Sequence, residues 1–281
     1  MSCVICGSSS NKVVFKEEEI DILSCFNCGH VYSSFLGSND YNTYFLSDIA
    51  QQDHSWWNKG HERMFRHFRN SYLLKSSGRL LDVGCGLGYF LKSIKDDQRT
   101  SSWNTVGVEI CAPAVYFARE QLGLSDIFLG KIEDTSLPLA VYDWITVWDV
   151  IEHILDPHPM LASIKRLLSP SGRLFIATPN IKVQLPKAYL KRLLFKNDSH
   201  ILEAKDHLQN YSPYSISRLL KTAGFSNIQF IQLPPISLVS GHQGLLMSTI
   251  KETWYQLARV IFYLSGRRWN FNNIYVIASL K

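Results

Sequence analysis

The sequence predicts an α/β protein with a mostly parallel sheet, preceded by a small unit that four cysteines tie to a metal. From about residue 78, short apolar runs alternate with helical patterns of roughly 10–15 residues, which is typical of parallel strands joined by helices. The first of these runs leads into a glycine-rich turn. Two C-x2-C pairs near the N-terminus predict the metal-binding unit.

Composition narrows the class of protein. The 281 residues fit one large α/β domain with an appendage, and the formal net charge of +5 is too weak to indicate nucleic-acid binding by itself. The N-terminal stretch MSCVICGSSS lacks the basic and apolar parts of a signal peptide. The most apolar late segment carries Lys251, Glu252 and Arg259, which argues against a membrane span. We therefore expect a cytoplasmic protein with no membrane span.

The N-terminal unit contains Cys3 and Cys6, then eighteen residues, then Cys25 and Cys28. This spacing is typical of a four-cysteine zinc site, and each pair is followed by a glycine that suits a tight turn. Residues 1–36 are too few to fold on a hydrophobic core alone, so we expect a zinc ribbon held by structural Zn²⁺. Four thiolates leave no open coordination position, which indicates a structural or recognition role. The alternative is a set of free thiols.

Residues 37–77 form a polar and aromatic segment that we expect to be a helical cap over the substrate. Apolar residues from about 56 to 74, including Met64 and Phe65, have helical spacing. Histidines and arginines such as His61 mostly fill the other positions. We expect them to form a solvated basic face.

The remaining chain, residues 78–281, should form the sheet domain. Insertions near 180–210 and 234–270 interrupt its alternation of strands and helices. The expected strands are 79–83, 104–109, 126–129, 143–148, 172–178, 227–233 and 273–280.

The glycine-rich turn has the spacing G-x-G-x-G at Gly84, Gly86 and Gly88, two residues after Asp82. Glycines allow a sharp turn and a close approach of ligand to backbone. An acid at the entrance would repel a pyrophosphate but could accept hydrogen bonds from a cationic amino-acid ligand. The second strand ends at Glu109, where a carboxylate can bind ribose hydroxyls. Together they predict a nucleoside-binding site, whereas a structural turn with a surface glutamate is the alternative.

Five ordered motifs extend this interpretation: LLDVGCGLG, VGVEI, YDWITVWDVIEHILDP, LLSPSGRLFIATPN and DHLQNYSPYSISRLLKTAGF. Over roughly residues 78–233 the chain resembles class I S-adenosylmethionine-dependent methyltransferases. The resemblance is strongest to the branch of ubiquinone-biosynthesis O-methyltransferases and bacterial glycan and natural-product enzymes. It implies a Rossmann-like seven-stranded, mostly parallel sheet whose last strand is antiparallel. S-adenosylmethionine would bind over the carboxyl ends of the first strands.

The resemblance also implies roles for single residues. The three glycines should line the methionine and ribose portion of the cofactor, Glu109 should bind the ribose hydroxyls, and Ile110 should pack against the adenine. Ile132 and Glu133 match the stretch that borders the adenine, and Cys85 is expected to be packed rather than reactive. The implied cofactor-binding positions are Asp82, Gly84, Cys85, Gly86, Gly88, Glu109, Ile110, Ile132, Glu133 and Asp149.

Asp149, Glu152 and His153 follow the fourth expected strand, at the sheet edge where ligands bind. An acid there could cap the next helix. His153 could instead act as a general base on an acceptor hydroxyl. In a third interpretation the group holds a divalent cation such as Mg²⁺. Related enzymes carry an E-x-x-E-H magnesium motif, of which D-x-x-E-H is the counterpart here, with His207 as the distant ligand.

The acceptor depends on what covers the cleft. Basic residues among leucines at 180–210 could form a lid over an anionic acceptor such as a nucleotide-linked sugar, or a plain solvated face. We expect O-methylation of a small-molecule or glycan acceptor. One alternative is an RNA methyltransferase that uses the ribbon for recognition; nucleic acid is disfavoured by the acidic EEE at 17–19. The other is a non-catalytic binding or regulatory protein.

Overall fold

The computed structural model describes residues 2–37, 55–195, 200–236 and 245–281. Parts of the expected cap and insertions, residues 38–54, 196–199 and 237–244, lie outside the described residues. The strands are β1 (Asn11–Glu17), β2 (Ile20–Cys25), β3 (Val31–Ser33), β4 (Arg79–Val83), β5 (Asn104–Glu109), β6 (Ile127–Leu129), β7 (Tyr142–Trp148), β8 (Leu168–Thr178), β9 (Gln209–Asn210), β10 (Phe225–Ile231) and β11 (Ile274–Leu280). The helices are α2 (Ser55–Tyr72), α3 (Tyr89–Lys95), α4 (Ala112–Glu120), α5 (His158–Leu167), α6 (Ile181–Phe195), α7 (Pro213–Thr222) and α8 (Leu245–Leu264).

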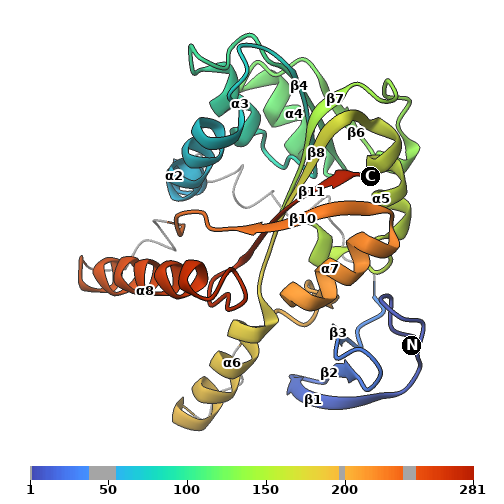
Figure 1. Cartoon of the computed structure of the whole chain (residues 1–281), viewed down its shortest axis with the longest axis vertical. Helices are drawn as coiled ribbons and strands as arrows, with labels where there is room; N and C mark the ends of the chain where they lie inside the picture. Colours follow the sequence, from blue (N-terminus) through green and yellow to red (C-terminus); the bar gives the residue numbers. More distant parts are fainter. Residues whose placement is uncertain (1, 38–54, 196–199, 237–244) are drawn as a thin grey trace.

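Seven strands form the large sheet in the order β10-β11-β8-β7-β4-β5-β6 (Figure 1). Neighbouring strands from β4 to β8 are parallel, whereas β11 runs antiparallel to both β8 and β10. The predicted seven-stranded sheet with an antiparallel last strand is confirmed. β8 begins at Leu168, earlier than expected, because Leu168 pairs with Tyr142 ahead of a register shift in the ladder between β7 and β8.

Helices cover both faces of this sheet (Figure 1). Leu80 and Trp144 join a buried cluster with residues of α2, α3 and α4. The next residue along each strand, Leu81 and Ile145, joins a second cluster with residues of α5 and α7. This alternation follows from the two-residue period of a strand, which sends successive side chains to opposite faces.

Helix α2 confirms the predicted helical segment, and Met64, Phe65 and Phe68 are buried. The predicted solvated basic face is wrong at two positions. His61 is 4% exposed and its ring stacks on Phe65 one helical turn away, at a centroid distance of 5.6 Å. Arg69 is also largely covered, because its guanidinium donates to Asp97 at 2.8 Å.

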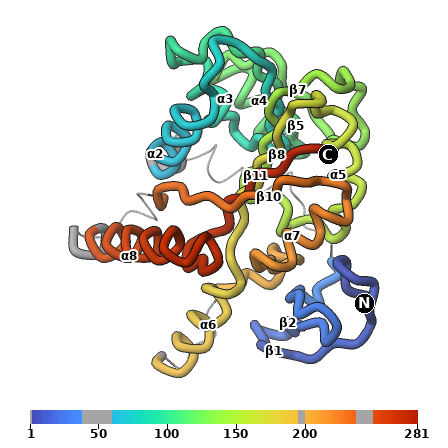
Figure 2. The backbone as a smooth tube through the Cα atoms, viewed as in Figure 1, coloured from blue at the N-terminus to red at the C-terminus, as the bar shows by residue number. Residues whose placement is uncertain are grey.

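The N-terminal ribbon forms a second sheet in the order β1-β2-β3-β9, and Figure 1 shows β1, β2 and β3 in blue close to the N-terminus. Its first three strands form an antiparallel meander, but β9 comes from the segment after α6, where Tyr32 pairs with Gln209. Helix α6 also contacts the ribbon, since the guanidinium of Arg192 lies 3.8 Å from the ring centroid of Phe15. The tube in Figure 2 shows how chain segments distant in sequence meet here.

The ribbon and the sheet domain share one hydrophobic cluster, in which Cys3 and Tyr32 pack with Tyr211 and with Leu219 of α7. Of the helices within the described ranges, none combines the length and apolar character required to cross a membrane.

Candidate active site

The glycine-rich loop joins β4 to α3, and its backbone requires glycine. Gly84, Gly86 and Gly88 have φ values of 69°, 53° and 85°, in the left-handed region that disfavours side chains. A Cβ atom on Gly84 would lie 2.4 Å from Val150 Cγ2, and one on Gly88 would lie 2.7 Å from Leu124 Cδ1. The loop is therefore closely packed on its protein side.

Glu109 at the end of β5 holds this loop. One carboxylate oxygen accepts the backbone N–H of Gly86 at 2.8 Å, and the other accepts that of Cys111 at 2.9 Å. Burial raises the pKa of Glu109, although these N–H groups favour the charged form. The carboxylate thus lies against the glycine loop, as its place in the sequence predicts.

Asp82 lies in β4 just before the loop and is 2% exposed. Its carboxylate accepts a hydrogen bond from Thr146 Oγ1 at 2.7 Å. Burial raises the pKa of Asp82 to about 8, and the nearby charge of Glu109 acts in the same direction. The structure therefore brings Asp82, Glu109 and the glycine loop together at the carboxyl ends of β4 and β5.

The other expected cofactor positions differ in exposure. Ile110 is 40% exposed, whereas Ile132 is buried in the hydrophobic core and Glu133 is half-buried. Cys85 is buried, and burial raises the pKa of its thiol well above its usual value, which favours an inert, packed side chain.

A second group of polar side chains lies at the carboxyl ends of β7 and β8. Glu152 and His153 occupy a short 3-10 turn, Ile151–His153, and His207 approaches from the loop before β9. One ligand atom each from Glu152, His153 and His207 lies within 4.8 Å of the others. The structure thus confirms the expected proximity of these three residues.

Hydrogen bonds orient this group. His153 Nδ1 lies 3.0 Å from the backbone oxygen of Asp206, and because a carbonyl can only accept, Nδ1 donates. Glu152 Oε2 accepts from Thr178 Oγ1 at 2.9 Å, while Oε1 is buried with no hydrogen-bond partner among the described residues. His207 Nε2 lies 3.2 Å from Glu203 Oε2.

Burial sets the protonation of these groups. It raises the pKa of Glu152 well above its usual value, an effect increased by Asp149, and so favours the neutral carboxyl. It lowers the pKa of His153 despite the opposing Asp206 carbonyl, and lowers that of His207 to about 3 with help from His153. Both imidazoles are therefore neutral near pH 7.

Asp149 is not among the three residues whose ligand atoms lie within 4.8 Å of one another, and its part in a cation site stays a prediction. It lies in a left-handed backbone conformation with φ of 49°, and its N–H donates to Ala177 O at 3.0 Å. The charge of Asp149 acts on both of these neighbours, because it raises the pKa of Glu152 and opposes the lowering of the pKa of His153 by burial. The capping interpretation is wrong, because the N-cap residues are Val150 for the 3-10 turn and Pro157 for α5, and neither position has a side-chain cap.

Sequence reasoning missed Thr178 and Asp206, which orient Glu152 and His153. It also missed His61, whose charge lowers the pKa of Asp149 against the raising effect of burial. Thr178 lies at the end of β8, where a strand was expected, but the sequence around it does not identify Glu152 as its hydrogen-bond partner.

The four N-terminal cysteines converge. Cys3 Sγ lies 3.5 Å from Cys28 Sγ, Cys6 Sγ lies 3.5 Å from Cys25 Sγ, and all four atoms lie within 4.8 Å of one another. Within the described chain these cysteines form no disulfide. Zn–S bonds of about 2.3 Å in a tetrahedron separate the sulfurs by nearly this distance. The arrangement fits a zinc ion.

The turns around the cysteines have the same geometry. The N–H of Gly7 donates to the carbonyl of Cys3 and that of Gly29 to the carbonyl of Cys25, both at 2.8 Å. Burial raises the pKa of Cys6, but hydrogen bonds from the Ser8 backbone and Asn27 outweigh it and lower the value to about 6. At Cys6 such bonds favour the thiolate, which is the form that binds metal, whereas burial raises the pKa of the Cys3 and Cys28 thiols.

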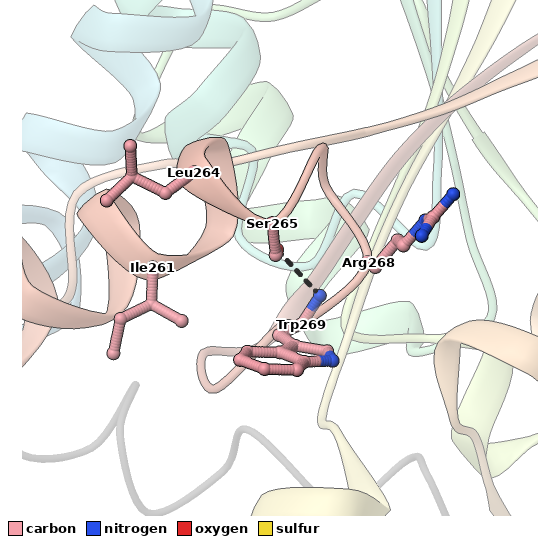
Figure 3. A pocket seen from close by; sticks show the side chains of 5 residues that line it. All are labelled: Ile261, Leu264, Ser265, Arg268 and Trp269. Carbon is pink, nitrogen blue, oxygen red and sulfur yellow. Dashed lines mark hydrogen bonds between the residues drawn. The ribbon is translucent and has the colours of Figure 1, made fainter.

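One pocket lies elsewhere, at the end of α8, with a volume of about 520 Å³. Figure 3 shows its lining by Ile261, Leu264, Ser265, Arg268 and Trp269, with the backbone N–H of Trp269 donating to Ser265 Oγ at 3.1 Å. None of these lining residues is an acid or a histidine, so the pocket has no acid–base pair comparable to the group at β7 and β8.

The sheet order and the glycine loop with its acidic partner define a class I S-adenosylmethionine-dependent methyltransferase domain. A family described as "Methyltransferase domain" matches residues 56–230, more than half of the chain, and the chain belongs to this family. A solved complex of the Haloferax volcanii Trm112 methyltransferase activator and a methyltransferase has the same fold, with a TM-score of 0.57 at 14% identity over 86% of this chain and 98% of that chain.

Two curated relatives give the level of similarity. A ubiquinone biosynthesis O-methyltransferase of Aeromonas salmonicida is 30% identical over 195 residues, covering 64% of this chain and 81% of the relative. A probable S-adenosylmethionine-dependent methyltransferase of Mycolicibacterium smegmatis is 26% identical over 174 residues, covering 62% of this chain. The chain spans 60% of that relative's own length.

Proposed function

We propose that the chain transfers the methyl group of S-adenosylmethionine to a hydroxyl of a small-molecule or glycan acceptor, with His153 as general base. One observation carries the proposal. His153 stands at the carboxyl end of β7, and Nδ1 donates to the Asp206 carbonyl at 3.0 Å. The lone pair of the neutral ring is then on Nε2, the atom that would take the acceptor proton.

The cofactor would be held by the groups around β4 and β5. The glycine loop leaves backbone accessible to a ligand, Glu109 can bind ribose hydroxyls, and Asp82 can bind the cationic amino-acid end. Bound S-adenosylmethionine supplies an electrophilic methyl group on a sulfonium. Ile110, with its exposed side chain, and the stretch at Ile132 and Glu133 would border the adenine.

The acceptor class is supported by the relative named for ubiquinone biosynthesis O-methylation, since an O-methyltransferase acts on a hydroxyl. The net charge of +5 is too small to indicate RNA binding, and the exposed ribbon residues Glu18 and Glu19 disfavour RNA as the acceptor. We propose that residues 1–36 form a zinc ribbon and that residues 78–281 form the methyltransferase domain. Residues 37–77 would form a cap that covers the acceptor bound to this domain.

A second candidate role for the cluster is favoured by the 4.8 Å grouping of Glu152, His153 and His207 and by the unpartnered oxygen of Glu152. These residues would hold a divalent cation, which would orient the acceptor oxygen and lower its pKa. Sensitivity of transfer to a chelator separates this role from that of a base alone.

Substitution of His153 tests the proposal. His153→Ala should abolish nearly all methyl transfer from isotopic S-adenosylmethionine into source-cell extract, with affinity for S-adenosylhomocysteine close to wild type. The control is His158→Ala, because His158 is exposed and pairs locally with Asp156. Transfer at the wild-type rate by the His153 variant would contradict both catalytic roles.

A further inference from the structure

We infer that Glu17 of the ribbon is a positioning residue for the two active-site histidines, so that the ribbon takes part in building the catalytic site. This inference rests on the proposed function of His153. It goes beyond it by assigning the ribbon a role that neither the cysteine spacing nor the methyltransferase fold implies.

Glu17 is the last residue of β1, and it is 2% exposed although it is an acid. Its carboxylate accepts two backbone hydrogen bonds, from Leu202 N at 3.0 Å and from Ala204 N at 2.7 Å. A buried carboxylate is costly unless hydrogen bonds compensate it, and bonds to a charged acceptor are stronger than neutral ones. The carboxylate therefore fixes the backbone of residues 202–204.

The segment that Glu17 fixes leads directly to the histidines. The backbone N–H groups of Asp206 and His207 both donate to the carbonyl of Glu203 at 2.8 Å, and Glu203 lies between the two residues whose N–H groups Glu17 accepts. The carbonyl of Asp206, in the same loop, accepts from His153 Nδ1 at 3.0 Å. Glu17 thus reaches each histidine through one short stretch of backbone.

Ser33 at the end of β3 supports the same loop. Its hydroxyl donates to the Ala204 carbonyl at 2.6 Å, and its N–H donates to the Leu208 carbonyl at 2.9 Å. Just beyond, His30 Nε2 lies 2.9 Å from Gln209 Oε1, and the amide of Gln209 donates to the Leu155 carbonyl at 2.8 Å. The ribbon therefore holds the loop on both sides of His207.

The first test is Glu17→Gln, with Glu19→Gln as the matched control. The substitution at Glu17 would place an amide NH₂ opposite an N–H donor and lose one of the two bonds, whereas Glu19 is exposed and pairs with Lys16 at 3.3 Å. We expect faster hydrogen exchange at the amides of Leu202 and Ala204 and a transfer rate at saturating S-adenosylmethionine lower by about tenfold or more. The affinity of Glu17→Gln for S-adenosylhomocysteine should match that of the wild type. The transfer rate of the control Glu19→Gln should also match that of the wild type.

A double-mutant cycle distinguishes positioning from general loss of structure. If Glu17 acts through His207, Glu17→Gln should lower the rate much less in a His207→Ala background than in wild type. Equal effects in both backgrounds, or a wild-type rate for Glu17→Gln, would overturn the inference, while His153→Ala separately reports on the proposed function. Should Glu17→Gln not fold, Ser33→Ala removes a single donor to the loop and enters the same cycle with the same expectations.

Discussion

The imidazole rings of His153 and His207 meet edge to face, with centroids 4.9 Å apart and planes at 67°. The two rings are supported from different parts of the molecule. His153 follows β7 of the large sheet, whereas His207 lies in the loop that the ribbon residue Glu17 holds. The sheet domain and the ribbon therefore both contact the segments that carry the pair.

Glu109 should contribute strongly to cofactor affinity. We expect Glu109→Gln to weaken binding of S-adenosylhomocysteine by about tenfold or more, because a neutral amide would lose the charge-assisted bond from the Gly86 N–H and the proposed bonds to the ribose. Isothermal titration calorimetry measures the change. Glu120→Gln, at the exposed end of α4, is the control, and equal affinities for the two variants would contradict the assignment.

Asp82 should make the stability of the cofactor-free protein depend on pH. Its pKa of about 8 in the folded state exceeds the usual 3.8, so its stabilising contribution is present below pH 3.8 and is lost as the pH rises toward 8. Asp82→Asn removes this loss. We expect the melting temperature of the variant, relative to wild type, to be higher at pH 8 than at pH 5; a difference that does not change with pH would show that Asp82 is not perturbed.

Alanine substitutions at Gly84 and Gly123 distinguish the backbone strain of a left-handed φ from the steric clash of an added Cβ atom. Both have left-handed φ values, 69° and 67°, but a Cβ has open space at Gly123 and lies 2.4 Å from Val150 Cγ2 at Gly84. Gly84→Ala should therefore destabilise the protein by roughly 1–3 kcal/mol more than Gly123→Ala in urea unfolding. Val150→Ala should recover part of this difference, and equal unfolding free energies for the two alanine variants would refute the packing argument.

The ribbon should contain zinc. We expect the purified protein to release one zinc ion per chain on denaturation, and Cys6→Ser to lower both the zinc content and the melting temperature. Cys111→Ala is the control, because Cys111 lies outside the four-sulfur cluster. Full zinc content in the Cys6 variant, or its absence from wild type, would contradict the proposed metal site.

The sequence predicted the large sheet well because strand periodicity and burial are local properties. The segments 79–83 and 104–109 are β4 and β5 as expected, and each carries its own apolar pattern before a turn. The position of Glu109 was predicted in the same way, since it ends a strand at a fixed interval after the glycine loop. Such signals need no knowledge of the rest of the chain.

The parts that escaped prediction depend on contacts between distant segments. The two-residue strand β9 exists because Gln209 and Asn210 pair with β3, and two residues carry no periodicity. His61 is buried because α2 is covered on more of its circumference than its apolar stripe indicates. Asp149 adopts a left-handed backbone conformation, which no spacing rule reveals.

The central claim is tested most directly by transfer of isotopic methyl from S-adenosylmethionine into fractionated source-cell extract, with and without a chelator. We predict label in the small-molecule or glycan fraction, in a product that retains the methyl as an ether. Loss of label with the chelator, while the ribbon retains its zinc, would assign Glu152, His153 and His207 to a divalent cation. Label confined to the RNA fraction, or no label in any fraction, would contradict the account.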